Sequence, residues 1–106
     1  MSEDITGEIV VPADHPALAG HFPGQPVVPA VVLLDEVLAE IRTRADFVLR
    51  SIPAAKFLQH VLPGERVVLH LQFTTLEAAQ MRASFQGLRA AALVFEGSFI
   101  VSGSKS

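Results

Sequence analysis

The sequence predicts an α+β domain in which one antiparallel sheet packs against a single long helix. Three observations lead to this fold class. An apolar stretch with helical spacing follows an early strand, a run of strand-like segments comes after it, and Pro-Gly and Gly turns divide that run. A chain of 106 residues, half of them apolar, can bury one core. We therefore expect a single domain over residues 1–106.

The first element is a short strand, and a long loop follows it. Ile5 to Val11 contains a short β-branched run and stops at Pro12, as a first strand would. Ala13 to Pro29 then holds four of the seven prolines and two glycines. Loops of this length in small domains tend to carry function.

The helix is predicted after Pro29, which suits a first helical position because the missing N–H is not needed there. Apolar residues recur at spacings of three and four, at Leu33, Leu34, Val37, Leu38 and Ile41. Val31 to Leu34 is apolar on every side, so we expect other elements to wrap the first turns. Arg42 and Arg44 suit the negative end of the helix dipole.

The rest of the chain predicts four hairpin-linked antiparallel strands. We expect them at Phe47–Gln59, Arg66–Thr75, Gln80–Gln86 and Arg89–Val101. The turns are expected at Pro63–Glu65, Leu76–Ala79 and Gln86–Leu88. In the second of these strands Val67, Leu69, Leu71 and Phe73 share one face, which should face the core.

Composition excludes several classes of function. The chain has eight basic and eleven acidic residues, so it lacks the excess of Lys and Arg that nucleic-acid binding requires. The absence of cysteine excludes disulfides, thiolate metal sites and thiol nucleophiles, and the spacing of His15, His60 and His70 matches no zinc pattern. We therefore expect neither metal nor cofactor.

The N-terminus and the apolar runs of the chain bear on where it is located and what it binds. Its N-terminus is acidic and polar, unlike a secretory signal, and no apolar run is long enough to cross a bilayer. We expect a cytoplasmic protein without a membrane span. A small chain with this many apolar residues usually buries part of its surface against a partner, which favours a homodimer.

One His and one carboxylate could form an acid/base pair. His21 lies on the proline-stiffened loop, and Asp35 comes 14 residues later, early in the helix after an apolar run. A carboxylate there is costly to bury unless it is paired or protonated. A fixed imidazole beside a protonated carboxyl suits general acid/base chemistry. Spacing alone leaves open that the histidine is a structural hydrogen-bonding group and that the aspartate faces water.

Two motifs resemble those of a known family. The run His21-Phe22-Pro23-Gly24-Gln25-Pro26-Val27-Val28-Pro29, followed by Leu34 and Asp35, closely resembles the HFPGxPVxPG signature of the 3-hydroxyacyl-[acyl-carrier-protein] dehydratases. Lys56 to Glu65, KFLQHVLPGE, is similar to that family's second pattern, KFxxPVxPGD. The preceding segment Val11 to Pro16 looks more like the compact dehydratases of aryl-polyene gene clusters.

The resemblance implies a hotdog fold, in which one sheet wraps a long central helix, and a dimer or a higher oligomer of dimers whose sheets join. It implies an active site at the dimer interface, with His21 from one subunit and Asp35 from the other as catalytic residues. Phe22, Gly24, Pro29 and Ala30 would bind the substrate, an acyl-carrier-protein or CoA thioester. The N–H of Ala30 at the helix N-terminus would polarise the thioester carbonyl.

Two departures from the family pattern keep other functions in view. Ala30 stands where the family has glycine, and His60 where it often has proline. A non-catalytic acyl-binding hotdog subunit therefore remains an alternative, as does a hotdog thioesterase, although thioesterases lack the HFPG run. Arg42, Arg44 and Arg50 could contact the phosphate of a carrier's prosthetic group, or could simply cap the helix and cover a solvated face.

Overall fold

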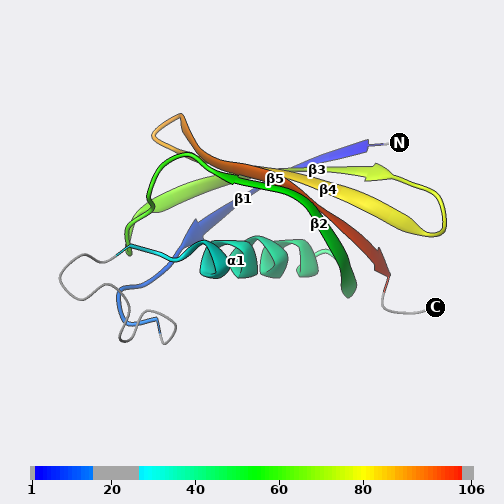
Figure 1. Ribbon diagram of the computed structural model, residues 1–106, viewed down its shortest axis with the longest axis horizontal. Helices are drawn as coiled ribbons and strands as arrows, with labels where there is room; N and C mark the ends of the chain where they lie inside the picture. Colours follow the sequence, from blue (N-terminus) through cyan, green and yellow to red (C-terminus); the bar gives the residue numbers. More distant parts are fainter. Residues whose placement is uncertain (1, 16–26, 104–106) are drawn as a thin grey trace.

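The computed structural model describes residues 2–15 and 27–103 as five strands and one helix. The elements are β1 (Ser2–Val10), α1 (Ala30–Arg42), β2 (Phe47–Phe57), β3 (Arg66–Thr75), β4 (Gln80–Arg89) and β5 (Ala92–Gly103). All five strands form one antiparallel sheet, and α1 lies along one of its faces (Figure 1). The predicted α+β class is confirmed.

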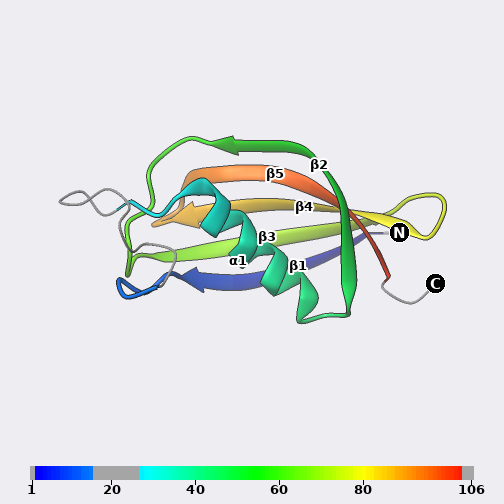
Figure 2. The same cartoon turned by 60° about the horizontal axis from the view of Figure 1, so that its bottom comes forward.

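The order of strands in the sheet is β1-β3-β4-β5-β2, so β1 and β2 form the two edges. Figure 2 shows the helix crossing this sheet obliquely, with β2 bending around one end of the layer. Only the β3-β4 and β4-β5 connections are hairpins between neighbours. The prediction that all four later strands are hairpin-linked is therefore wrong for β2, which leads across to β3 on the other side of the sheet.

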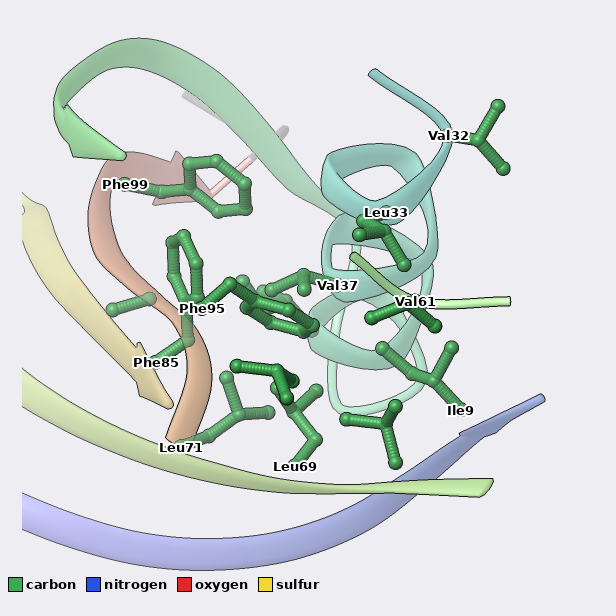
Figure 3. Packing of buried hydrophobic residues seen from close by; sticks show 14 of the residues in the cluster. Ile9, Val32, Leu33, Val37, Val61, Leu69, Leu71, Phe85, Phe95 and Phe99 are labelled. Carbon is green, nitrogen blue, oxygen red and sulfur yellow. The ribbon is translucent and has the colours of Figure 1, made fainter. Parts of the chain in front are cut away.

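The core lies between the helix and the sheet. One side of α1 contributes Val32, Leu33, Val37 and Ile41, all buried. The alternation predicted for β3 is confirmed, since Val67, Leu69, Leu71 and Phe73 are buried while the residues between them face outward. Figure 3 shows Leu33 and Val37 of the helix facing Phe85, Phe95 and Phe99 of the sheet.

One predicted turn is wrong, and its residues continue a strand. Gly87 lies inside β4, opposite Phe95 of β5. The strand ends at Arg89, three residues after its predicted end at Gln86, and the chain reverses at Ala90–Ala91. Both alanines have positive φ, 50° and 68°. The predicted turn at Leu76–Ala79 is confirmed, with Ala78 and Ala79 also in the left-handed region.

No helix of the described residues is both long and apolar enough to cross a membrane.

Candidate active site

The second motif and the described end of the first motif, residues 27–29, lie near the N-terminus of α1. His21, Phe22 and Gly24 fall outside the described residues, so their roles stay predictions. Pro29, Ala30 and Asp35 lie in the described part, at the start of α1. The described part of the site therefore consists of the N-terminus of α1 and the loop that contacts it.

The N-terminus of α1 offers free backbone donors. Pro29 is extended, with φ −61° and ψ 148°, and no side chain caps the helix. The carbonyl oxygen of Pro29 accepts the N–H groups of Val32 at 3.0 Å and Leu33 at 3.2 Å. Within the described part of the chain, the N–H groups of Ala30 and Val31 have no acceptor. Unpaired donors at the positive end of a helix dipole suit a carbonyl oxygen that gains negative charge.

Ala30 takes up this position without backbone strain. It is the first residue of α1, it is exposed, and its φ is not among the positive values. A glycine is therefore not needed here for backbone geometry. Any cost of the extra methyl group would come from contact with a substrate and not from the fold.

Asp35 is exposed, and this corrects the expectation that the first helical turns are wrapped on every side. Val31, one turn before it, is 67% exposed, and Ala39, one turn after it, is exposed as well. The physical reason is that a helix lying on a sheet buries one stripe and leaves the opposite stripe open. A single chain therefore presents Asp35 on an outer helical stripe that begins with an apolar side chain.

The second motif forms a loop that contacts the approach to the helix. The N–H of Val28 donates to the carbonyl oxygen of Val61 at 2.8 Å, and Gly64 donates to that of Val11 at 2.8 Å. Gly64 has φ +85°, a conformation that favours glycine. The two motifs, more than thirty residues apart in sequence, are thus joined by a backbone hydrogen bond two residues before Ala30.

Sequence reasoning missed Arg89, the residue that ties this loop to the sheet. Its guanidinium donates to the carbonyl oxygen of His60 at 2.6 Å, and to Oε1 of Gln59 and of Glu65 at 2.8 Å each. The hydrogen bond from the N–H of Leu62 and the nearby Arg89 lower the pKa of Glu65. The missing cue was the turn at Ala90–Ala91, which places Arg89 at the end of β4 above the loop.

The edge strand β2 is exposed along most of its length. Every residue from Arg50 to Phe57 is exposed, including the apolar Ile52. Phe57 at its end stacks obliquely on buried Phe95, with ring centroids 6.0 Å apart. An edge of this length with apolar side chains invites pairing with another strand.

The sheet carries a hollow away from the helix. It measures about 650 Å³, and its lining mixes apolar residues with the polar side chains of Lys56, His70, Arg82 and Glu96. Nε of Arg50 donates to the hydroxyl of Ser102 at 2.8 Å. Arg42, in the last turn of α1, donates to the carbonyl oxygen of Phe47 at 3.2 Å, which fits the structural role considered for it.

Comparison with known proteins gives the same family as the two motifs. A family model described as "ApeI-like: ApeI dehydratase" matches residues 1–98. The 3-hydroxyacyl-[acyl-carrier-protein] dehydratase FabZ of Chlamydia trachomatis serovar L2 is 31% identical over 98 residues. That match covers 82% of this chain and 64% of the dehydratase, so the chain spans less than two thirds of this relative's length.

Solved structures show the same fold at low identity. An (R)-hydratase from A. caviae involved in PHA biosynthesis matches with a TM-score of 0.80 and 13% identity, covering 96% of this chain and 95% of that one. A chain of the dehydratase heterocomplex ApeI:P from Xenorhabdus doucetiae matches with a TM-score of 0.74 and 18% identity, covering 96% and 94%. These likenesses confirm the hotdog fold.

Proposed function

Because the chain belongs to the ApeI-like dehydratase family, we propose that it converts a 3-hydroxyacyl thioester, bound to acyl carrier protein or CoA, into the trans-2-enoyl thioester. The observation that carries this proposal is the uncapped start of α1. It presents the N–H groups of Ala30 and Val31 about one turn before an exposed carboxylate, Asp35. The reaction needs an oxyanion stabiliser and an acid close together, and α1 supplies both kinds of group.

The proposed reaction has two proton transfers. The imidazole of His21 removes the proton on C2 of the substrate, and the electrons move into the thioester carbonyl, whose oxygen accepts hydrogen bonds from the helix N-terminus. The electrons then return to form the C2–C3 double bond while the C3–O bond breaks. Asp35 protonates the departing hydroxyl, which leaves as water.

To act as an acid, Asp35 must be protonated, but water around an exposed carboxylate favours the charged form. The chemistry therefore requires a partner that covers Asp35. We propose that a second copy of the chain covers the outer stripe of α1 and brings its own His21 to Asp35. The exposed strand β2 supports such a dimer, since two copies pairing along β2 would extend each sheet into the other. We expect this dimer in the cytoplasm.

A hydration assay on crotonyl-CoA and on crotonyl-acyl carrier protein tests the function in the reverse direction. The wild type should consume the enoyl absorbance, whereas His21→Ala and Asp35→Asn should each lose about 100-fold or more in kcat. Arg66→Met is a control for the loss of a surface charge, since the exposed Arg66 side chain pairs with Glu8 of β1 at 3.2 Å, and it should retain the wild-type rate.

Three outcomes would contradict parts of the proposal. A wild type inactive on both thioesters would exclude the dehydratase and favour a non-catalytic acyl-binding subunit. Release of free thiol without hydration would indicate a thioesterase. Equal activity in the wild type, His21→Ala and Asp35→Asn would exclude the assigned roles of His21 and Asp35, while leaving the reaction itself in place.

A further inference from the structure

The loop of residues 58–65 is the structural support of the helix N-terminus. Its carbonyl oxygen at Val61 accepts the N–H of Val28 at 2.8 Å, one residue before Pro29. Val28 and Val61 are both buried, so the bond is shielded from water. A shift of this loop therefore displaces the backbone that leads directly into α1.

Four backbone hydrogen bonds hold the two ends of the loop. The N–H groups of Leu58 and Gln59 donate to the carbonyl oxygen of Val94, Gly64 donates to Val11, and Glu65 donates to Leu62. These bonds fix where the loop leaves β2 and enters β3. They leave the middle of the loop, around His60, to be held by side chains.

Arg89 holds that middle. Its Nη1 donates to the carbonyl oxygen of His60 and to Oε1 of Glu65, and its Nη2 donates to Oε1 of Gln59. The same Oε1 of Glu65 accepts the N–H of Leu62 at 2.8 Å. Contacts on both sides of Val61 thus converge on one planar guanidinium, whose fixed fork of donors is suited to several acceptors at once.

We propose that Arg89 is a positioning residue for the thioester site: it fixes the loop around Val61 and, through the Val61–Val28 hydrogen bond, sets the position of the helix N-terminus at Ala30. The inference rests on the proposed function, because the N–H of Ala30 is the group that would stabilise the enolate oxygen. Arg89 itself contacts no reacting atom. Its effect should therefore appear in kcat and leave substrate binding nearly unchanged.

The test combines hydration kinetics with amide hydrogen exchange of the whole chain. Arg89→Met removes all three contacts and keeps the apolar stem, whereas Arg89→Lys keeps the charge but cannot span three acceptors. Arg66→Met serves as the control, since Arg66 also lies at a strand end and its side chain pairs with Glu8 of β1, which is not part of the loop. The amide of Val28 reports directly on the bond to Val61.

We expect Arg89→Met to lower kcat roughly tenfold with KM changed less than about twofold, and to speed exchange at Val28 by about tenfold. Exchange at Leu69 and Leu71 in β3 should stay at the wild-type rate. Arg89→Lys should fall between Arg89→Met and the wild type in both measurements, and Arg66→Met should match the wild type.

The inference is overturned if Arg89→Met leaves kcat and Val28 exchange unchanged in an active protein. It is also overturned if exchange rises equally at Val28 and in β3, because Arg89 would then support only global stability. A wild type without hydration activity would remove the proposed function and this role together, so failure of the function is distinguishable from failure of the inference alone.

Discussion

Gly87 shows how a single missing side chain lets the core close. It lies in β4 opposite Phe95, and a Cβ atom added there would overlap the ring of Phe95. Phe95 is fully buried and its ring packs against Phe85 and Phe57, with centroids 6.1 Å and 6.0 Å away. The ring therefore has no free direction in which to move.

We expect Gly87→Ala to lower the free energy of unfolding by about 1–3 kcal/mol, because overpacking a closed core forces rings off their preferred rotamers. Urea unfolding followed by circular dichroism measures this. Gln86→Ala, at the exposed neighbouring position, should change the value by less than about 0.5 kcal/mol. A Gly87→Ala protein as stable as the wild type would mean that the Phe95 ring can move aside.

The same residue explains an error of sequence interpretation. A glycine within a strand-like run signals either a turn, through its freedom at positive φ, or a close approach of another group. Local sequence does not distinguish these two meanings. At Gly87 the deciding factor is the ring of Phe95, which comes from the next strand. At Gly64, by contrast, the preceding proline made the turn predictable, and its φ is +85°.

At the scale of elements, the turn that joins β4 and β5 has an unfavourable backbone conformation for its residues. Arg89 pairs with Ala92, so Ala90 and Ala91 are the two turn residues, and both have positive φ. Left-handed backbone costs alanine about 1 kcal/mol per residue, whereas Asn-Gly is the preferred pair in such turns. This strained turn directly follows Arg89, whose guanidinium contacts the loop of residues 58–65.

The double substitution Ala90→Asn with Ala91→Gly should raise the free energy of unfolding by about 1–2 kcal/mol. Thermal and urea unfolding both report the gain. Ala92→Gly, one residue later inside β5, should instead lower stability by about 0.5–1 kcal/mol because it loosens a strand. A double variant no more stable than the wild type would exclude strain at this turn.

The helix was the most predictable element, although one expectation about its burial was wrong. The helix expected after Pro29 is found at Ala30–Arg42. Of the apolar residues at helical spacing, Leu33, Val37 and Ile41 are buried, because a periodicity of 3.6 reflects the face that meets the sheet. Apolar spacing also predicted burial for Val31, which is exposed. Periodicity reports which positions are apolar and not which element covers them, so an apolar side chain on the open side of the helix looks the same in the sequence as one in the core.

At the scale of the whole molecule, strand order was the part that local patterns could not give. The order β1-β3-β4-β5-β2 depends on β2 and β3 lying on opposite sides of the sheet, which no turn motif specifies. The candidate site was predictable as two sequence motifs, because each is a recognisable run of residues in the chain. The hydrogen bond between Val28 and Val61, and the clamp from Arg89, required the tertiary structure.

The two sheet edges allow a matched test of the proposed dimer. Ile52 on β2 is 43% exposed, and Val10 on the opposite edge strand β1 is 41% exposed. A lysine on a pairing edge opposes strand addition, because its charge would have to be buried. Light scattering after size exclusion should show Ile52→Lys as a monomer and Val10→Lys as a dimer. A dimeric Ile52→Lys protein would place the interface elsewhere.

Subunit mixing tests whether each active site takes residues from two chains. His21→Ala and Asp35→Asn proteins, each inactive alone, are unfolded together in equal amounts and refolded. Random pairing makes half of the dimers mixed, and each mixed dimer holds one complete site if His21 of one chain works with Asp35 of the other. Activity should then recover to about one quarter of the wild-type value. If both residues act within one chain, every site lacks one of them, and the mixture stays inactive however the dimers form.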